Sequence, residues 1–514
     1  MDLDLTRRRL FTADFRRVMV KRHWKTAGKF LAFAVVLCVS VHFVWRVIVP
    51  KFFADSSWPT TSAYLGFYEM EENTVDVLFF GSSHAASFFL PQELYNGYGI
   101  TGYNLGCEQQ NLVVSYFWLG EALRFQKPKA VVLDCYMLFP YISTEPLNTA
   151  ESCTRKAIDY MKWSSVKKDA VQTICRLDEN QSLESYYFPN IRYHKRWEGL
   201  SENDFSFSDM AGHYELKGYA PQAAYGGRQD FAPFEIGDMD AKENMVPLMA
   251  EYLGHMEKLC RQNGIPFVLV KTPTTAQSPA KSLAIQNFAR EHDLHFLDFN
   301  EKGLYEKINF CFETDNCDDG HGSIWGARKV TAQIGKKLAR WYGLGGHKDS
   351  QWEETRDYYE GIKKDCELAH MTDLAEYLQA VLDERYYVFL SAKDARLPGL
   401  KPAALKGLKE LGLSAGLRED AGCSYLAVIL NGKAQEQSGI DQLEQDGAIR
   451  DGVVRYEMVS AGSGCGNVSS IKIDGTEYSK NGRGLNFVVY NQVTKRIVDA
   501  VCFDINEDGV AAIR

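Results

Sequence analysis

The sequence lacks the cysteine patterns of zinc-binding proteins and the positive charge of nucleic-acid-binding proteins. Its 12 cysteines include no C-x-x-C pair and no paired Cys/His spacing that would hold zinc tetrahedrally. The formal net charge is −9, and the basic cluster is confined to a short N-terminal tail, whereas neutralising phosphates needs a basic face. We therefore expect no structural metal site, no cofactor and no nucleic-acid partner.

The cysteines do not decide the redox compartment. Cys311 and Cys317 are close enough in sequence to form a disulfide, and Cys423, Cys465 and Cys502 fall together in the last third of the chain. An oxidising compartment would permit disulfides, yet thiols kept buried and reduced fit the same count. The pairing therefore stays open.

The composition is that of an ordinary globular protein, with 45% hydrophobic and 24% charged residues, so wholesale disorder or a fibrous repeat is excluded. A chain of 514 residues is too long for one core, because cores stop growing near roughly 250 to 300 residues. We expect a cytoplasmic basic tail at 1–27, a transmembrane helix at 28–49, an α/β domain at 52–345, a helical linker at 346–384 and a smaller α+β or β-rich domain at 385–514.

One long apolar run stands near the N-terminus. The stretch from Phe30 to Trp45 carries no Asp, Glu, Lys or Arg, and the whole run approaches the roughly 20 residues that a spanning helix needs. Lys and Arg residues between Arg7 and Lys25 predict a cytoplasmic N-terminus, which places everything after Pro50 outside the cell membrane. No small-residue A-x-A site follows, so an uncleaved single-pass anchor is favoured over a signal peptide. The alternative is a buried helix of a soluble domain.

Strand-like and helix-like segments alternate over the next 270 or so residues, as in α/β proteins. Strands are predicted at 75–81, 130–133, 266–270 and 295–299, and helices at 113–125, 245–262, 284–291 and 326–342. The alternation predicts a central parallel sheet, and ligands bind such sheets beyond the carboxyl ends of the strands. Motifs at those ends therefore matter most.

The first predicted strand leads directly into Gly81-Ser82-Ser83-His84. A serine on a strand-to-helix turn projects its hydroxyl outward, and the helix N-terminus offers N–H groups to a developing oxyanion. Small residues at such turns are also common without any chemistry. Ser83 is therefore a candidate nucleophile that needs a partner.

A second motif, Asp318-Asp319-Gly320-His321, precedes the last predicted helix. An Asp three residues before a His can place its carboxylate against one imidazole nitrogen, while the other nitrogen takes a proton from a serine. A polar loop that caps the following helix would have the same composition. A metal-dependent hydrolase that uses Asp315, Asp318, Asp319 and His321 is a more distant alternative.

Together the two motifs resemble the SGNH/GDSL hydrolase superfamily, in which a G-D/S-S block follows the first strand and a D-x-x-H block precedes the last helix. The resemblance covers residues 74–342 and implies a flavodoxin-like α/β sandwich with a central parallel sheet. It makes Ser83 the nucleophile, His321 the base and Asp318 the carboxylate that orients the base.

The resemblance is incomplete at the oxyanion hole. The superfamily adds a glycine N–H from a second block, and the Y-N-L-G segment ending at Gly106 matches that block, with Gly106 as donor. The asparagine of a third block is absent, because L-D-C-Y at 133–136 ends the strand instead. Gln110 and Asn111 are candidates to replace its amide, and ordinary loop polarity is the alternative for both.

A subset of bacterial SGNH-like proteins shares the N-terminal anchor, G-S-S-H, Y-N-L-x-x-x-x-Q and K-P-K-x-V-V-L-D. They resemble extracytoplasmic proteins that handle acyl groups on cell-wall or exported polysaccharides, some beside a membrane-bound O-acyltransferase. The resemblance implies an O-acyl esterase or acyltransferase that acts on an acylated polysaccharide or glycan through an acyl-serine. A catalytically inactive assembly or glycan-binding factor at the cell surface is the alternative, which the missing asparagine favours.

The stretch 178–234 is rich in aromatic residues and glycine without clear periodicity, so it predicts a long insertion over the strand ends. Tyr193, Trp197 and Tyr219 are candidates for stacking on sugars. Such residues more often only pack the insertion itself.

The charged stretch 349–384 predicts a solvated helical spacer. Beyond it we expect strands at 386–394, 424–430, 453–459, 469–473, 485–490 and 497–503, and a helix at 401–411. The segments 482–490 and 498–504 resemble the ILEI/PANDER-like domain, over about 385–509. The resemblance implies a module that binds a glycan or a partner, and a purely structural role is the alternative. Arg483 and Asn486 stand at a predicted strand start, where we expect structural groups rather than ligand contacts.

Overall fold

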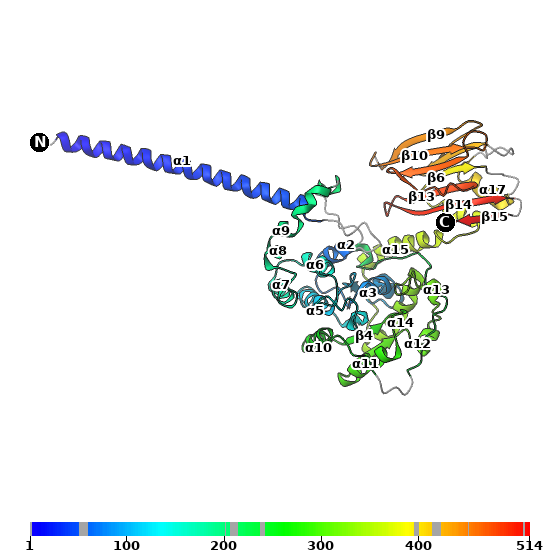
Figure 1. The fold of residues 1–514 in the computed structure, drawn as a ribbon, viewed down its shortest axis with the longest axis horizontal. Helices are drawn as coiled ribbons and strands as arrows, with labels where there is room; N and C mark the ends of the chain where they lie inside the picture. Colours follow the sequence, from blue (N-terminus) through cyan, green and yellow to red (C-terminus); the bar gives the residue numbers. More distant parts are fainter. Residues whose placement is uncertain are drawn as a thin grey trace.

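The computed structural model describes residues 3–50, 60–200, 202–205, 214–236, 242–394, 400–413, 423–450, 452–506 and 509–514. They form a long N-terminal helix, an α/β unit and a β-rich unit (Figure 1). This coarse layout confirms the sequence prediction. The expected start of the first domain, at residue 52, lies outside the described residues.

Helix α1 (Leu3–Ile48) projects away from the rest of the chain (Figure 1). Its portion Thr26–Ile48 has 23 residues and a mean hydropathy of 2.2. Among the described residues it is the one helix long and apolar enough to cross a membrane. The predicted apolar helix is therefore confirmed, and a helix of this kind serves either as a membrane span or as a signal sequence.

The α/β unit is built on five parallel strands in the order β2-β1-β3-β4-β5. The strands are β1 (Val77–Phe80), β2 (Gly102–Asn104), β3 (Ala130–Asp134), β4 (Phe267–Lys271) and β5 (His295–Asp298). The first four are buried along their whole length, which is why β1, β3 and β4 appear in the sequence as apolar runs. The three-residue strand β2 was not predicted, because it is too short to show a pattern.

Helices cover both faces of this sheet, so the unit has three layers. One face packs against α2 (Thr60–Phe67), α5 (Leu112–Ala122), α10 (Pro247–Gln262) and α11 (Pro279–Glu291). The other face packs against α3 (Ser83–Phe88), α4 (Pro91–Tyr98) and α14 (Ile324–Tyr342). Two apolar cores, one on each side, therefore fix the strand ends in place.

A long insertion joins β3 to β4. Its elements are η1 (Tyr136–Leu138), α6 (Glu151–Asp159), α7 (Ser165–Leu177), α8 (Leu183–Tyr187), α9 (Asn190–Tyr193), η2 (His194–Gly199), η3 (Glu202–Phe205) and η4 (Tyr214–Leu216). Two more short helices, α12 (Lys302–Lys307) and α13 (Phe312–Asp315), precede α14. The insertion is therefore largely helical, although its sequence shows little periodicity.

The predicted spacer is helical but not solvated, which corrects the sequence interpretation. Helix α15 (Ser350–Leu368) buries Trp352 and Tyr359 completely, and the Tyr359 hydroxyl donates to the Glu93 carboxylate of α4 at 2.7 Å. At its other end, Asp365 accepts hydrogen bonds from the β-rich unit. Helix α15 contacts both the α/β unit and the β-rich unit, so its buried residues do not form one apolar face. Its sequence therefore resembles that of a charged surface helix.

The β-rich unit contains two antiparallel sheets and two helices. The six-stranded sheet has β6 (Tyr386–Lys393), β7 (Ser424–Leu430), β8 (Lys433–Gly439), β13 (Gly484–Asn491), β14 (Arg496–Asn506) and β15 (Gly509–Ile513). The four-stranded sheet has β9 (Leu443–Ile449), β10 (Val454–Ala461), β11 (Val468–Ile473) and β12 (Thr476–Glu477). One core lies between the sheets, and a second lies between the larger sheet and helices α16 (Leu374–Ala380) and α17 (Pro402–Glu410).

Strands β8, β9, β12 and β15 were not predicted. Strand β8 is an edge strand with mainly polar and exposed residues, and β12 has only two residues. Edge strands pair with a neighbouring strand on one side only and often carry polar or charged residues, so their sequences show little apolar patterning. The strands that the sequence predicted, β6, β7, β10, β11, β13 and β14, supply most of the strand residues of the two cores.

All twelve cysteines are free thiols, including Cys311 and Cys317. Burial raises the pKa of the Cys107 and Cys260 thiols to about 12 in each case. Thiols of this kind stay protonated and unreactive at neutral pH. The buried cysteines therefore pack as small apolar residues.

Candidate active site

The turn after β1 positions the first predicted residue, Ser83. Gly81 has a φ of +141°, and a Cβ there would lie 2.9 Å from the Cβ of Asp134, so the turn accepts only glycine. Ser82 follows as the N-cap of α3, where its hydroxyl accepts the N–H of His84 at 3.4 Å. Ser83 is the first residue of the helix and is 9% exposed. The turn thus holds the Ser83 hydroxyl beyond the carboxyl end of β1.

The loop between α13 and α14 positions the other two residues. The Cys317 N–H donates to the His321 carbonyl at 2.9 Å, and Asp318 Oδ1 accepts the N–H groups of Gly320 and His321 at 2.8 Å each. Gly320 lies against His84, and a Cβ at this position would be 2.7 Å from the His84 ring. The loop is therefore a closed turn packed directly on α3.

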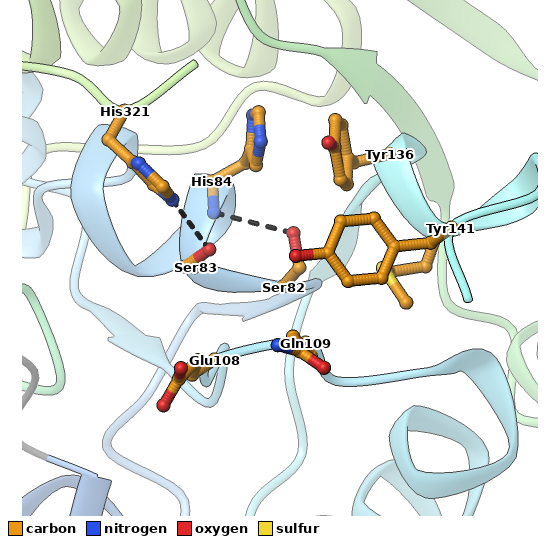
Figure 2. A pocket seen from close by; sticks show the side chains of 9 residues that line it. Ser82, Ser83, His84, Glu108, Gln109, Tyr136, Tyr141 and His321 are labelled. Atoms are coloured by element: carbon orange, nitrogen blue, oxygen red, sulfur yellow. Dashed lines mark hydrogen bonds between the residues drawn. The ribbon is translucent and has the colours of Figure 1, made fainter. Parts of the chain in front are cut away.

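Ser83, His321 and Asp318 form a hydrogen-bonded chain. The Ser83 Oγ lies 2.7 Å from His321 Nε2, and His321 Nδ1 lies 2.7 Å from Asp318 Oδ2 (Figure 2 shows the Ser83–His321 pair). Because the carboxylate accepts a hydrogen bond from Nδ1–H, Nε2 is left as the acceptor for the serine hydroxyl. The structure thus brings the three predicted residues together, although Ser83 and His321 lie 238 residues apart in the chain.

The Asp318 carboxylate keeps its charge in this arrangement. Burial alone would raise its pKa, but the hydrogen bond and the positive charge of His321, with the backbone N–H groups of Gly320 and His321, outweigh that effect. The pKa of Asp318 is therefore lower than usual for an Asp. A carboxylate that is always ionised can hold one tautomer of the histidine and stabilise its protonated form.

A small pocket of about 120 Å³ opens in front of the serine (Figure 2). Residues from four segments line it, namely Ser82, Ser83, His84, Glu108, Gln109, Tyr136, Met137, Tyr141 and His321. Figure 2 shows Ser83 and His321 on one side and the Tyr136 and Tyr141 rings on the other. The pocket therefore offers a reactive hydroxyl, aromatic walls and polar groups within a space suited to a small acyl group.

His84 is a wall residue that the sequence did not single out. Its ring stacks on Tyr136, with centroids 3.8 Å apart, and lies 5.1 Å from the His321 ring. Burial lowers the pKa of His84 well below its usual value, and the charges of Lys271 and His321 lower it further. His84 is therefore a neutral ring that packs beside the proton-accepting histidine without competing for its charge.

Gly106 does not fit the role that the sequence suggested for it. Its N–H donates to Asn104 Oδ1 at 2.9 Å, so it is not free to bind an oxyanion. The Asn104 Nδ2 in turn donates to the carbonyls of Ala85 and Phe89. This segment ties the loop after β2 to helix α3, and Gly106 is absent from the pocket lining.

Gln110 and Asn111 are likewise occupied elsewhere, which corrects their proposed role. Gln110 is buried, and its amide bonds the hydroxyls of Tyr64 and Ser115. Asn111 caps helix α5, where its Oδ1 accepts the Val114 N–H at 3.0 Å. A buried amide must satisfy its own hydrogen bonds, and these two do so inside the fold rather than at the pocket.

The neighbouring Gln109 lines the pocket instead. It has a φ of +51°, and its Oε1 accepts the Thr149 hydroxyl at 3.2 Å. No acceptor within the described part of the chain lies within hydrogen-bonding distance of its Nε2. Gln109 therefore offers an amide donor in the pocket that Ser83 also lines, and its left-handed backbone left no sequence signal.

At the end of β3, where the asparagine of the superfamily's third block would be expected, the chain has L-D-C-Y instead. Asp134 is buried there, and its carboxylate accepts the N–H of Tyr136 at 3.0 Å and both the N–H and the hydroxyl of Thr272. It joins the ends of β3 and β4. The residue that reaches the pocket from this strand is Tyr136.

The remaining sequence candidates lie outside the pocket. Tyr219 is 1% exposed, Tyr193 donates to the Asp159 carboxylate, and Trp197 is exposed on the insertion. Asp315 binds the Lys329 ammonium and the Cys311 N–H, so it does not converge with Asp318. Over the described ranges no group of three or more His, Cys, Asp or Glu residues is placed to hold a metal ion.

Comparisons with known proteins leave the site to be interpreted from its geometry. No protein-family model matches the chain. No curated protein matches it. The chemistry that the arrangement permits is nucleophilic attack by a serine whose proton is taken by a carboxylate-oriented histidine.

Proposed function

We propose that the chain is an SGNH-type serine hydrolase or acyltransferase that moves O-acyl groups on a cell-surface or exported polysaccharide. The observation that carries the proposal is the Ser83–His321–Asp318 chain at the wall of a small pocket. The order of the motifs and their placement at the carboxyl ends of parallel strands support it. The proposed fold is the SGNH form of the three-layer α/β unit.

The proposed reaction has two halves. Ser83 Oγ attacks the ester carbonyl carbon while its proton passes to His321 Nε2, and the resulting imidazolium is stabilised by Asp318. The tetrahedral intermediate collapses to an acyl-serine, and the sugar oxygen leaves with the proton from His321. Water or a second sugar hydroxyl then attacks the acyl-serine by the reverse sequence, which distinguishes hydrolysis from transfer.

Two donors are proposed for the oxyanion. The Ser83 N–H lies in the first turn of α3, where amides have no acceptor within the helix. The Gln109 Nε2 is the side-chain donor at the pocket wall, in place of the superfamily's asparagine. Electrostatic stabilisation of this kind is usually the largest single contribution to acyl transfer.

The apolar helix supports a location at the cell membrane. We propose that Thr26–Ile48 is a single-pass anchor with its N-terminus in the cytoplasm, since Lys and Arg residues precede it. The α/β and β-rich units then lie outside, where the polysaccharide is. A membrane-bound O-acyltransferase is the proposed partner that would supply the acyl group for transfer.

The β-rich unit is proposed to be an ILEI/PANDER-like module that binds a glycan or a partner. Arg483 pairs with the Asp504 carboxylate through two hydrogen bonds, at 2.7 and 3.0 Å. Asn486 exchanges hydrogen bonds with the backbone of Gly482. These contacts support a structural role for both side chains, so a ligand surface would have to lie elsewhere on the module.

A second candidate function is a binding or assembly factor of the same fold without catalysis. The engagement of the Gly106 N–H by Asn104 favours it, because one oxyanion donor of the superfamily is then missing. The complete Ser83–His321–Asp318 chain favours the enzyme. A binding factor would have no need of an oriented histidine 2.7 Å from a serine hydroxyl.

Acyl release decides between the two candidates. The full-length protein in detergent or lipid is incubated with p-nitrophenyl acetate and with an O-acetylated polysaccharide, beside a Ser83→Ala variant. Release by the wild type and its loss in the variant, with an acetyl adduct on Ser83 in the mass spectrum, are expected of the enzyme. Release that survives in Ser83→Ala contradicts the serine mechanism, and inactivity of both proteins with unchanged glycan binding supports the binding factor.

A further inference from the structure

The outer end of helix α1 is docked on the insertion of the α/β unit. The Arg196 Nη1 donates to the Ile48 carbonyl at 2.5 Å, and the Arg196 guanidinium also pairs with Asp204 at 2.7 Å. Val47, one residue before the end of the helix, is only 5% exposed. Helices α9, η2 and η3 contact α1 here, and Figure 1 shows α9 beside the end of α1.

An arginine at this place suits the end of a helix. The last carbonyls of a helix have no partner within it and carry a partial negative charge, which a guanidinium stabilises. Asp204, which is 2% exposed, neutralises the arginine from the other side. The contact therefore fixes the insertion to the last turn of α1.

The same stretch of the insertion exposes large apolar side chains. We call Tyr187, Phe188, Ile191, Trp197 and Phe205 the juxtamembrane patch, and their exposed fractions are 42%, 59%, 51%, 65% and 52%. Trp163 stacks on Tyr187 at 4.7 Å and extends the surface. Elsewhere on the described part of the α/β unit, large apolar side chains are exposed to this degree only at Tyr141, Leu183 and Tyr225. Soluble surfaces rarely concentrate such side chains.

The length of the apolar helix places this patch relative to a bilayer. Twenty-three residues of helix span about 35 Å, against about 30 Å for the hydrocarbon core. If Thr26–Ile48 crosses the membrane, Ile48 lies at the headgroup level, and the segment that contacts it lies at that level too. Trp and Tyr side chains are enriched at this depth in membrane proteins.

We propose that the juxtamembrane patch inserts into the headgroup region of the outer leaflet, as a second attachment of the protein beside its helix. The proposal rests on the membrane anchor described above. Exposed Lys195, between the apolar side chains, suits contact with lipid phosphates. Two attachments hold the α/β unit in one orientation on the membrane surface, with its pocket at a fixed height above the lipid.

Quenching by brominated lipids tests the insertion. The full-length protein is reconstituted in phosphatidylcholine vesicles with or without bromine on the acyl chains, and Trp197→Phe is compared with the wild type. The Trp197 emission, obtained by difference, should fall about twofold or more in brominated vesicles, because interfacial side chains sit within reach of the upper acyl chains. The emission assigned to Trp341 by Trp341→Phe, on α14, should not change.

A matched pair of added tryptophans keeps the test independent of Trp197. Ile191→Trp, in the patch, should gain an emission that brominated lipid quenches. Ile440→Trp, at a comparably exposed position in the β-rich unit, should gain one that it does not quench. Equal emission of Ile191→Trp in the two kinds of vesicle would overturn the proposal.

Extraction at alkaline pH separates this proposal from the anchor on which it rests. Full-length protein that stays in the membrane in carbonate at high pH has a spanning helix. If it stays but the patch is not quenched, the insertion is refuted and the anchor stands. If it is extracted, the anchor itself is refuted, and the patch proposal falls with it.

Discussion

The α/β unit and the β-rich unit bury polar side chains in different ways. At the strand ends of the α/β unit, the ionisable groups Asp134, Lys271 and His84 are buried, and His84 lines the pocket in front of Ser83. In the β-rich unit the buried hydroxyl of Ser391 donates to the Val459 carbonyl and that of Ser460 to the Ala392 carbonyl, and both bonds join the two sheets.

The difference indicates which of the two units is expected to hold a reactive site. A hydroxyl bonded to a backbone carbonyl stabilises the sheet and has no free group for a ligand. Ionisable groups cost more to bury, so a cluster of them beside a cavity indicates a function that offsets the cost. Variants of the pocket residues in the first unit should therefore change chemistry without stability, and variants of core residues in the second unit should do the reverse.

The largest effect is expected from His321→Ala. Removing the base that takes the Ser83 proton should lower kcat/KM for acyl release by about 10³- to 10⁴-fold. The melting temperature should stay within a few degrees, because His321 is partly exposed and packs little. Steady-state kinetics and calorimetry on the same preparation check this. Wild-type kinetics in this variant would contradict the proposal that the α/β unit catalyses acyl release through His321.

The reverse case is Phe389→Ala in the core between the two β-sheets. Phe389 is fully buried against Tyr456, so its truncation should cost about 3–5 kcal/mol of unfolding free energy in the β-rich unit. Acyl release per folded molecule should not change. Chemical denaturation followed with an activity assay measures both quantities, and a loss of activity without a loss of stability would contradict the division between the units.

Gln109→Ala tests the proposed side-chain donor. Its loss should lower kcat by about 10²- to 10³-fold, the range for one oxyanion donor. Gln110→Ala is the neighbouring control: its amide is bonded inside the fold, so it should lower stability and leave kcat per folded molecule within a few-fold. If the two variants exchange these phenotypes, the assignment of Gln109 is wrong.

Asp365→Asn tests how the two units are coupled. Asp365, on α15, accepts the Tyr386 hydroxyl at 2.8 Å and the Asn491 amide at 2.9 Å, and burial raises its pKa. In Asp365→Asn, one carboxylate oxygen is replaced by an amide NH2 group that faces the Asn491 amide donor. Two facing donors should lower the free energy of unfolding by about 1–3 kcal/mol. The β-rich unit should then unfold at a lower temperature than the α/β unit, as two resolved transitions in calorimetry. A single unshifted transition would argue against the coupling.

The smallest effect is expected at Asp383. It accepts hydrogen bonds from Arg385 at 2.9 Å and from Lys364 at 3.1 Å, and although burial opposes the shift, these partners lower its pKa. A carboxylate with a lowered folded-state pKa stabilises the fold above its unfolded-state pKa, near 4, and loses that contribution as the pH falls further. The free energy of unfolding of the wild type should exceed that of Asp383→Asn by less than about 1 kcal/mol at pH 7, because the ion pairs of Asp383 are partly solvated. Denaturation at pH 7 and pH 3 should show the difference shrinking with acid.

Several features of the fold followed from the sequence alone. The apolar runs of β1, β3 and β4 and the periodic faces of α10 and α14 predicted the parallel sheet and its helices, because burial on both faces leaves a continuous apolar signal. The spacing of Asp318 and His321 predicted their pairing, since three residues suffice to close a turn. The charge-free stretch of α1 predicted the apolar helix.

Tertiary structure decided the rest, because it depends on contacts between distant segments. Ser83 meets His321 only when α3 and α14 pack together, and the choice of Gln109 over Gln110 depends on a left-handed backbone at one residue. The role of α15 as a joint rather than a spacer depends on partners from both units. Sequence patterns record whether a residue is buried, but the hydrogen bonds that occupy a polar group, and so decide whether it is free for chemistry, are set by the packed fold.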